Sequence, residues 1–364
     1  MAVQQDLVFA LVVVLRLGVP LFIPRFPLPA LLASLVVDGI DQTIFQWFDV
    51  TSVLGEYQNY DKALDVYYLV IAYTATMRNW HDDVAFRIGR LLWYWRLVGT
   101  VAFEFSGWGP LLLIFPNTFE YFVIAYEAIR TRWRPTRLSD RQLIALAAAI
   151  WVIVKLPQET WIHVLHLDVT DESAAHPVLA VLVLATLVAV VVAVVGVARR
   201  RVPPPDWRFA VDVDAHQARK RPDNRPEGGG TLLRTTAEKA ALTSMVVVIF
   251  GHILPSTAGA GALALGVCVV VALNAGVTEL LEWRRLVPLS VVARFALEVV
   301  INAMIFEALV LLRGAVVVDR LTALFLLVLL SLVITLYDHF RAVSYGIAVD
   351  PPGASTTTSV STAC

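Results

Sequence analysis

Charged side chains are scarce in this 364-residue chain, because Asp, Glu, Lys and Arg together make up only 16% of it. Soluble globular domains contain about 25% charged residues, so a protein whose whole surface faces water is excluded. Hydrophobic residues reach 58%, and the mean hydropathy is +0.70. The composition therefore predicts an integral membrane protein, with the lipid bilayer as its first partner.

A basic excess and a cysteine framework are also missing. The net charge is −1, which gives no positive field to attract nucleic acid. Cys268 and Cys364 stand alone and supply neither a disulfide framework nor a cysteine metal site. The chain contains no Walker A loop, no Gly-rich dinucleotide fingerprint and no G-x-S-x-G motif, and no internal repeat relates its two halves. The sequence therefore points to no particular cofactor.

Long uncharged runs are the main positive feature. The run from Pro177 to Ala198 contains no charged residue and is long enough to cross a hydrocarbon core of about 30 Å. Similar runs predict an all-α fold, a polytopic transmembrane bundle of about ten or eleven helices. The predicted spans are 7–24, 28–47, 64–79, 86–105, 109–130, 141–157, 177–198, 240–254, 258–281, 289–312 and 321–337.

Clusters of arginine indicate how these helices are oriented. Basic residues gather in the connections near 78–90, 130–141, 199–225 and 284–285, and an even number of predicted spans separates every pair of them. Because cytoplasmic loops are enriched in Lys and Arg, we expect all four connections on the cytoplasmic side. The sequence predicts a multi-pass protein of the cell membrane with its N-terminus outside and its C-terminus in the cytoplasm. High Ala, Val and Arg with little Lys is typical of a GC-rich bacterial genome.

The composition divides the chain into four parts. Residues 1–198 hold seven predicted helices rich in charged and aromatic residues, and 240–340 hold four apolar ones. Between them, 199–239 contains a triple proline, a triple glycine and scattered arginines, so we expect a flexible cytoplasmic loop. This loop is either a solvated linker or a docking site for a protein partner. The tail 341–364 is expected to be disordered.

The second predicted span carries a polar stripe. At 100° per residue, Asp38, Asp41 and Gln42 fall with Gln46 and Asp49 within an arc of about 140° on one helical face. Ionisable groups inside a membrane are costly and face other helices or a water-filled cavity. The stripe therefore indicates either a path for an ion or substrate, or structural hydrogen bonds near the outer end of the helix.

A second acidic group belongs to the next predicted helix and its preceding loop. Asp61, Asp65 and Tyr68 share a face through i, i+4, i+7 spacing. We expect the two aspartates to converge with Asp38 and Asp41 near the outer surface. Four such carboxylates would either bind a hard cation such as Mg²⁺ or Ca²⁺ or share protons.

Further ionisable residues interrupt the first, fourth and fifth predicted spans. Arg16 lies in the middle of the first span and must face protein or reach the interface. Arg96 and Glu104 share one face of the fourth span, and Glu120 lies in the fifth. We expect Arg96 to be the counter-ion of Glu104 or of a carboxylate on the second or fifth span, in a pair that is functional or purely architectural. Pro116 frees a backbone carbonyl within the fifth span, and broken helices can line binding sites.

The predicted outer loop after the sixth span contains metal-ligand chemistry. His163 and His166 are spaced i, i+3, and Asp168 follows them, which could place both imidazoles on one face as metal ligands. The alternative is a set of hydrogen-bonded surface groups.

These features support three hypotheses of function. The first is a transporter or channel-like protein whose cation or proton path is lined by the aspartates, with Arg96, Glu104 and Glu120 as an interior relay. The second is a metal-dependent membrane enzyme, in which the four aspartates hold a metal against the phosphate of a lipid-linked substrate. The third is a non-catalytic scaffold whose 199–239 loop recruits a partner. The polar stripe of the second span favours the first hypothesis.

Overall fold

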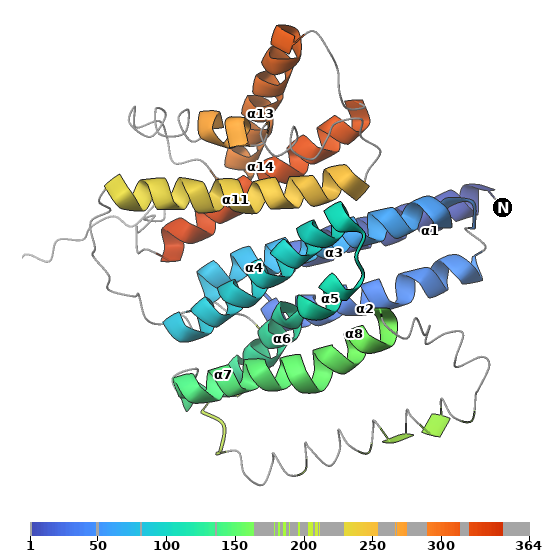
Figure 1. The fold of residues 1–364 in the computed structure, drawn as a ribbon, viewed down its shortest axis with the longest axis vertical. Helices are drawn as coiled ribbons and strands as arrows, with labels where there is room; N and C mark the ends of the chain where they lie inside the picture. Colours follow the sequence, from blue (N-terminus) through green and yellow to red (C-terminus); the bar gives the residue numbers. More distant parts are fainter. Residues whose placement is uncertain are drawn as a thin grey trace, which may run out of the picture.

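The computed structural model describes residues 2–48, 51–80, 82–134, 137–163, 229–253, 268–274, 290–313 and 320–344, with Gly266 and short pieces between 178 and 211. Every regular element in these ranges is a helix, and none of them contains a strand (Figure 1). The all-α class predicted from the sequence is therefore confirmed.

Helices cover most of the predicted spans. The predicted spans 177–198 and 258–281 lie largely outside the described residues. The N-terminal half contains α1 (Ala2–Gly18), the 3₁₀ turn η1 (Val19–Phe22), α2 (Pro27–Trp47), α3 (Thr51–Asn79), α4 (Asp83–Ser106), α5 (Pro110–Ile114), α6 (Thr118–Arg130), α7 (Asp140–Ala149), the π-helical turn η3 (Ile150–Lys155) and α8 (Leu156–His163). The C-terminal half contains α11 (Gly229–Ile253), α13 (Val291–Arg313) and α14 (Arg320–Ser344).

Local sequence signals set several helix ends. The Asp82 side chain accepts hydrogen bonds from two backbone N–H groups of the first turn of α4. Gly107, with a φ of 64°, ends the same helix in the left-handed conformation that glycine tolerates. Ser139 and Gln142 form a capping box at the start of α7. These boundaries therefore follow from the residues next to them.

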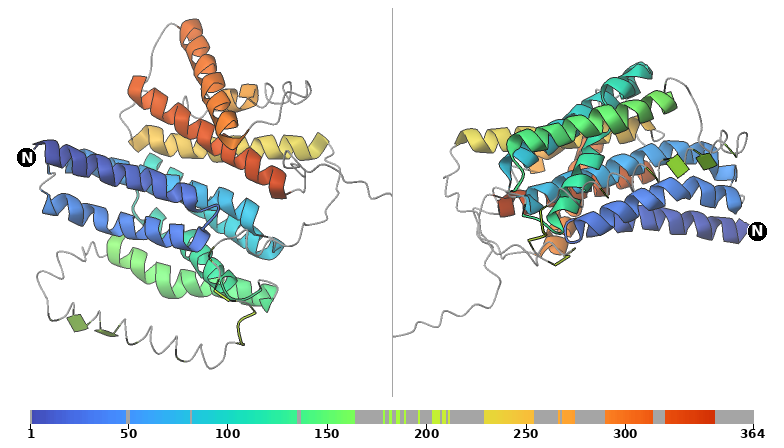
Figure 2. Two further views of the ribbon diagram at one scale, coloured as in Figure 1. Left: turned by 180° about the vertical axis from the view of Figure 1, so that it is seen from behind. Right: turned by 90° about the horizontal axis from the view of Figure 1, so that it is seen from below.

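Helix α3 occupies the centre of the bundle. Its residues 66–77 are all buried, and α1, α2, α4, α11 and α14 pack around it. A helix without a polar face is buried on all sides, and the hydroxyls of Thr74 and Thr76 donate back to carbonyls of the same helix. Figures 1 and 2 show the long helices side by side with roughly parallel axes, whereas α13 is tilted steeply against them. Helix α3 thus joins the N-terminal half to α11 and α14.

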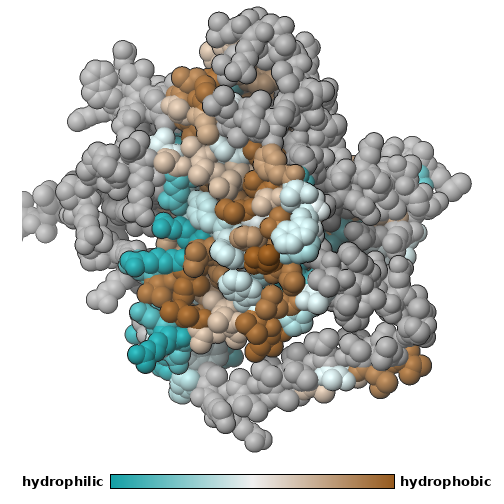
Figure 3. All heavy atoms as spheres, in the orientation of Figure 1, coloured by the Kyte–Doolittle hydropathy of each residue, from teal (hydrophilic) through white to brown (hydrophobic). Residues whose placement is uncertain are grey.

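Part of the surface of the bundle is apolar, while its interior holds charge. Leu32, Val36 and Ile40 form an exposed stripe along α2, whereas Arg16 and Asp41 are buried. Figure 3 shows apolar residues over the middle of one face of the molecule. Soluble proteins keep charge outside and do not expose long apolar stripes. The arrangement is the one expected of helices that lie in lipid.

Three helical stretches among the described residues are long and apolar enough to cross a membrane: Pro27–Phe45, Pro110–Arg130 and Asp140–Thr160. Leu7–Phe22 and Leu324–Phe340 are apolar but shorter. This finding is compatible with a membrane location and supports the predicted count of ten or eleven spans only in part. Helices α3 and α4 contain more charged residues, which interrupt their apolar runs.

Three helix boundaries differ from the predicted ones. Helix α3 begins at Thr51, so the acids before its buried part lie on a helix rather than in an outer loop. Helix α11 begins at Gly229, inside the predicted loop 199–239, and α14 ends at Ser344, inside the predicted tail 341–364. Charged residues of α3, α11 and α14 find partners on neighbouring helices. Such partners allow a polar stretch to stay helical in an otherwise apolar bundle.

Candidate functional site

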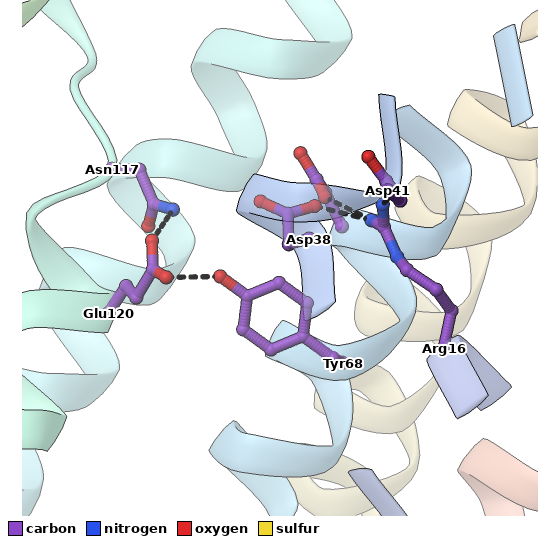
Figure 4. Close-up of polar contacts among 7 residues, drawn as sticks. Arg16, Asp38, Asp41, Tyr68, Asn117 and Glu120 are labelled. Atoms are coloured by element: carbon purple, nitrogen blue, oxygen red, sulfur yellow. Dashed lines mark hydrogen bonds and ion pairs between the residues drawn. The ribbon is translucent and has the colours of Figure 1, made fainter. Parts of the chain in front are cut away.

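Arg16 of α1 lies among three carboxylates from two other helices (Figure 4). Its guanidinium forms ion pairs with Asp38 at 2.6 Å, with Asp41, and with Asp65 at 2.7 Å. Asp38 and Asp41 come from one face of α2, and Asp65 comes from α3. The structure therefore brings together three of the four aspartates that were expected to converge from their helical spacing. It also shows that these aspartates share Arg16 as their counter-ion, which the pattern of acidic residues does not reveal.

Packing of α1 against α2 and α3 positions the guanidinium. Val12 of α1 packs against Phe45 of α2 in a small apolar cluster. The Tyr67 hydroxyl of α3 donates a hydrogen bond of 2.9 Å to the carbonyl of Leu17. Arg16 lies between these two contacts along α1, so its side chain enters the space where the three helices meet.

The three carboxylates differ in their access to solvent. The Asp65 side chain is 42% exposed, that of Asp38 26%, and that of Asp41 1%. Carboxylates that share one counter-ion are electrostatically coupled, because the protonation of one changes the energy of the others. The cluster therefore has an open end at Asp65 and a closed end at Asp41.

Glu120 of α6 forms a second buried polar group with Tyr68 of α3 and with Asn117, which directly precedes α6 (Figure 4). The Tyr68 hydroxyl donates to one of its oxygens, and the Asn117 amide donates to the other at 2.7 Å. Two donors stabilise a carboxylate in apolar surroundings. Tyr68 follows Asp65 by three residues, so one side of α3 contributes to both groups.

The predicted break at Pro116 separates α5 from α6. Trp95 donates from its indole N–H to the carbonyl of Ile114 at 3.1 Å, and Arg96 donates to the carbonyl of Phe115 at 3.2 Å. Both donors lie on α4. That helix therefore satisfies carbonyls that the break frees, as membrane-embedded breaks require.

Of the alternative counter-ions expected for Arg96, Glu104 is not the one that the structure shows. No ion pair joins these two side chains, both of which the structure describes, and Arg96 donates to the backbone of the break instead. Eight residues of helix span about 12 Å along the axis, so sharing a face does not bring them into contact. Arg96 has only a weak electrostatic interaction with Glu120 of α6, so a counter-ion on the second or fifth span stays a prediction.

Lys155 is a buried cation that the sequence patterns do not single out. Its Nζ lies 4.2 Å from the ring centroid of Tyr121 and donates to Gln158 at 3.0 Å. A lysine near the end of an apolar run is ordinarily expected to extend toward water. Only the packing of η3 against α6 shows that it is enclosed. The π-helical turn itself is a signal, because such turns are frequent at functional sites.

The part of the chain that the structure describes contains no three His, Cys, Asp or Glu side chains arranged to hold a metal ion. The carboxylates that a metal site would use share Arg16 instead. The following predicted site residues have side chains outside the described ones: Gln42, Asp61, His163, His166 and Asp168.

Residues 203–206, at the start of the predicted cytoplasmic loop, contact the arginine-rich connection after α6. Asp206 accepts hydrogen bonds from the backbone N–H of Arg134 at 2.8 Å and from the Arg137 side chain at 2.5 Å. The Arg134 hydrogen bond, followed by the bond and charge of Arg137, lowers the pKa of the Asp206 carboxyl. Two connections that the charge pattern assigns to one side of the membrane are joined here.

Fold and site together define an all-helical protein with helices suited to a membrane and with buried ion pairs between them. Comparison of the chain with protein-family models, with curated proteins and with solved structures finds no match. The evidence on function therefore comes from the residues of the chain itself.

Proposed function

We propose that this chain is a polytopic membrane protein that moves protons or small cations along an acid-lined path between α1, α2, α3 and α6. The observation that carries the proposal is the convergence of Asp38, Asp41 and Asp65 on Arg16. Ionisable groups are costly inside a membrane and mark ion pathways and proton relays there.

The outer entrance of the path is the Arg16 cluster. One guanidinium faces three carboxylates, so the set carries more negative than positive charge when all groups are ionised. Such a set attracts protons or cations from water. Asp65 and Asp38 are the solvent-accessible members, and Asp41 is the enclosed one, which gives the path a direction from water into the bundle.

Tyr68 and Glu120 form the interior step. A phenolic hydroxyl can donate one hydrogen bond and accept another at the same time, and that of Tyr68 donates to Glu120. Arg96 and Lys155 both interact electrostatically with Glu120. The guanidinium of Arg96 stays charged and repels a passing metal cation, so the interior step favours a proton over a larger ion.

The proposed topology has about ten or eleven spans, an outside N-terminus and a cytoplasmic C-terminus. Two contacts support it: the Arg78 side chain donates to the carbonyl of Pro24, and Arg137 pairs with Asp206. Each contact joins connections that the charge pattern assigns to the cytoplasmic side. In this topology the Arg16 cluster falls in the outer half of the membrane.

The other two hypotheses gain less support. A metal-dependent enzyme would need its ion among the aspartates, where Arg16 lies. A scaffold would act through the 199–239 loop, most of which lies outside the described residues.

Proton flux into proteoliposomes under an imposed pH gradient, and then under a membrane potential, tests the proposal. We expect Asp41→Asn to abolish the flux and Asp140→Asn, an exposed residue at the start of α7, to leave it unchanged. Glu120→Gln provides a second variant that keeps the Arg16 cluster intact, and it is expected to lower the flux as well. Normal flux through folded Asp41→Asn and Glu120→Gln proteins would reject the acid-lined path.

A further inference from the structure

The C-terminal half contains a further buried polar cluster, built of two amides, one hydroxyl and one carboxylate. Glu298 and Asn302 lie one turn apart on α13, Asn274 lies on the helical residues 268–274, and Ser331 lies on α14. All four residues are at most 4% exposed. The helices around them are among the most apolar of the chain, so the cluster is an exception to its surroundings.

Hydrogen bonds connect these side chains across three helical segments. The Asn274 amide donates to the Glu298 carboxylate and, at 3.2 Å, to the Asn302 oxygen. The Asn302 amide donates to the Ser331 hydroxyl at 2.9 Å, and that hydroxyl donates to the carbonyl of Leu327 at 2.7 Å. Glu298 is thus the one ionisable member of a continuous network.

Within the described ranges no ion pair joins Glu298 to Arg or Lys, although Lys239 and Arg294, which lies one turn before it on α13, interact with it electrostatically from a distance. Lys239 is held by both oxygens of Asp338, at 3.0 Å each. A buried carboxylate in apolar surroundings requires a bound positive charge or a proton. When Glu298 is ionised, the cluster therefore carries one negative charge that a single monovalent cation can neutralise.

Thr335 supplies an independent observation on the same face of α14. It follows Ser331 by one turn, it is 1% exposed, and its hydroxyl has no hydrogen-bond partner among the residues that the structure describes. Helical hydroxyls usually donate back to a carbonyl of the preceding turn, as those of Ser331 and Thr243 do here. Buried polar atoms without a partner are uncommon, so this oxygen is available to a ligand.

We propose that this cluster binds one Na⁺ ion between α13 and α14, with Glu298 as its charged ligand and Thr335 as a neutral one. An amide exchanges its oxygen and its NH₂ group by rotating its last torsion, so Asn274 and Asn302 can turn oxygens toward the ion. One carboxylate among neutral oxygens matches a single positive charge, whereas divalent ions require more carboxylates. The site lies on other helices than the acid-lined path and does not depend on it.

The test measures thermal unfolding of the purified full-length chain in sodium chloride and in choline chloride of equal ionic strength. Mass action predicts a higher unfolding temperature in sodium, because the ion binds only the folded protein. Binding of radioactive sodium at equilibrium is expected to saturate at one ion per chain. Equal unfolding temperatures in the two salts, with no bound sodium, would overturn the proposal.

Thr335→Val separates an ion site from a purely structural network. The substitution keeps the shape of the side chain and removes a hydroxyl that has no protein partner. A structural network therefore predicts no effect, as does a proton held on Glu298 alone. A cation ligand predicts a loss of sodium affinity of about tenfold.

Glu298→Gln is expected to abolish the sodium response, and Glu307→Gln, at an exposed position of the same helix, is expected to preserve it. A sodium response that survives unchanged in both Thr335→Val and Glu298→Gln would contradict the proposed ligands. Proton flux through the Asp41 path is a separate measurement, so a failure of either proposal is distinguishable from a failure of the other.

Discussion

The two halves of the molecule bury their polar groups in different ways. In the N-terminal half, the charged Arg16 cluster joins α1, α2 and α3, and its Asp65 side chain is partly exposed. In the C-terminal half, amides and hydroxyls join α13 and α14 around Glu298, and every member is enclosed. A cluster of several charges with one exposed end suits exchange with water, whereas an enclosed network with a single carboxylate suits the retention of one ion. Substitutions in the two clusters should therefore change the free energy of unfolding by different amounts.

Removal of the central cation should have the largest effect. In Arg16→Gln, three carboxylates lose their shared partner, and breaking a buried ion pair from one side costs about 3–5 kcal/mol. We expect a corresponding loss in the free energy of unfolding in detergent. Arg87→Gln, at an exposed position of α4, is the control and should change stability by less than about 0.5 kcal/mol. A loss below about 1 kcal/mol in Arg16→Gln would show that the cluster is weakly coupled to the fold.

Substitution of Gly99, where α4 closely approaches the helix break at Pro116, should have the second largest effect on stability. A Cβ atom at Gly99 would stand 2.1 Å from the Cβ of Phe115, so Gly99→Ala forces the two segments apart at a cost of about 1–3 kcal/mol. At Gly39 of α2 no atom lies within 4 Å of the added Cβ, and Gly39→Ala should be neutral or stabilising by about 0.5–1 kcal/mol. Thermal unfolding of the two variants measures the difference. Equal effects would contradict the packing at the break.

Substitutions in the Glu298 network of the C-terminal half should destabilise the protein less than substitutions in the Arg16 cluster. Asn302→Ala removes hydrogen bonds to Asn274 and Ser331, and interhelical hydrogen bonds in membranes are each worth about 0.6 kcal/mol. We expect a total loss of about 1–2 kcal/mol in choline chloride, where no sodium contributes. A loss as large as that of Arg16→Gln would erase the energetic contrast between the two halves.

The smallest effect is expected at the surface, where Asp206 binds the connection after α6. Because the folded structure lowers its pKa below the ordinary value of 3.8, its contribution is present above that pH and is lost as the pH falls through the lowered pKa. The indole N–H of Trp133 donates to the carbonyl of Pro203, so Trp133 fluorescence should report release of residues 203–206 in acid. Asp206→Asn should show no such acid transition, and an identical transition in both proteins would assign it to another group.

Helical spacing was sufficient to group the acids of α2 and α3 but not to find their partner. Asp38 and Asp41 share a face because a helix repeats every 3.6 residues, and this holds before any packing is known. A central Arg16 signals only that its side chain faces protein or reaches the membrane interface. The same spacing rule fails for Arg96 and Glu104, because a shared face does not mean contact across two turns.

Buried cations and hydroxyls were the features that spacing could not reveal. Lys155 stands at the end of an apolar run, where a lysine that reaches water and one that is enclosed look alike in the sequence. Thr335 is one of several hydroxyls in apolar helices, and its lack of a partner is a property of the packed structure. Both residues acquire their roles from neighbouring helices.

By itself, the sequence determined the helical class, the apolar character of the helices and the break at Pro116, because each depends on neighbours within a few turns. The tertiary structure decided which charges meet. Arg16 lies 25 positions from Asp41 and 49 from Asp65 along the chain, and only the packing of three helices brings them within ion-pair distance. Packing also decided which of the polar groups are enclosed, because burial depends on every helix that surrounds a residue.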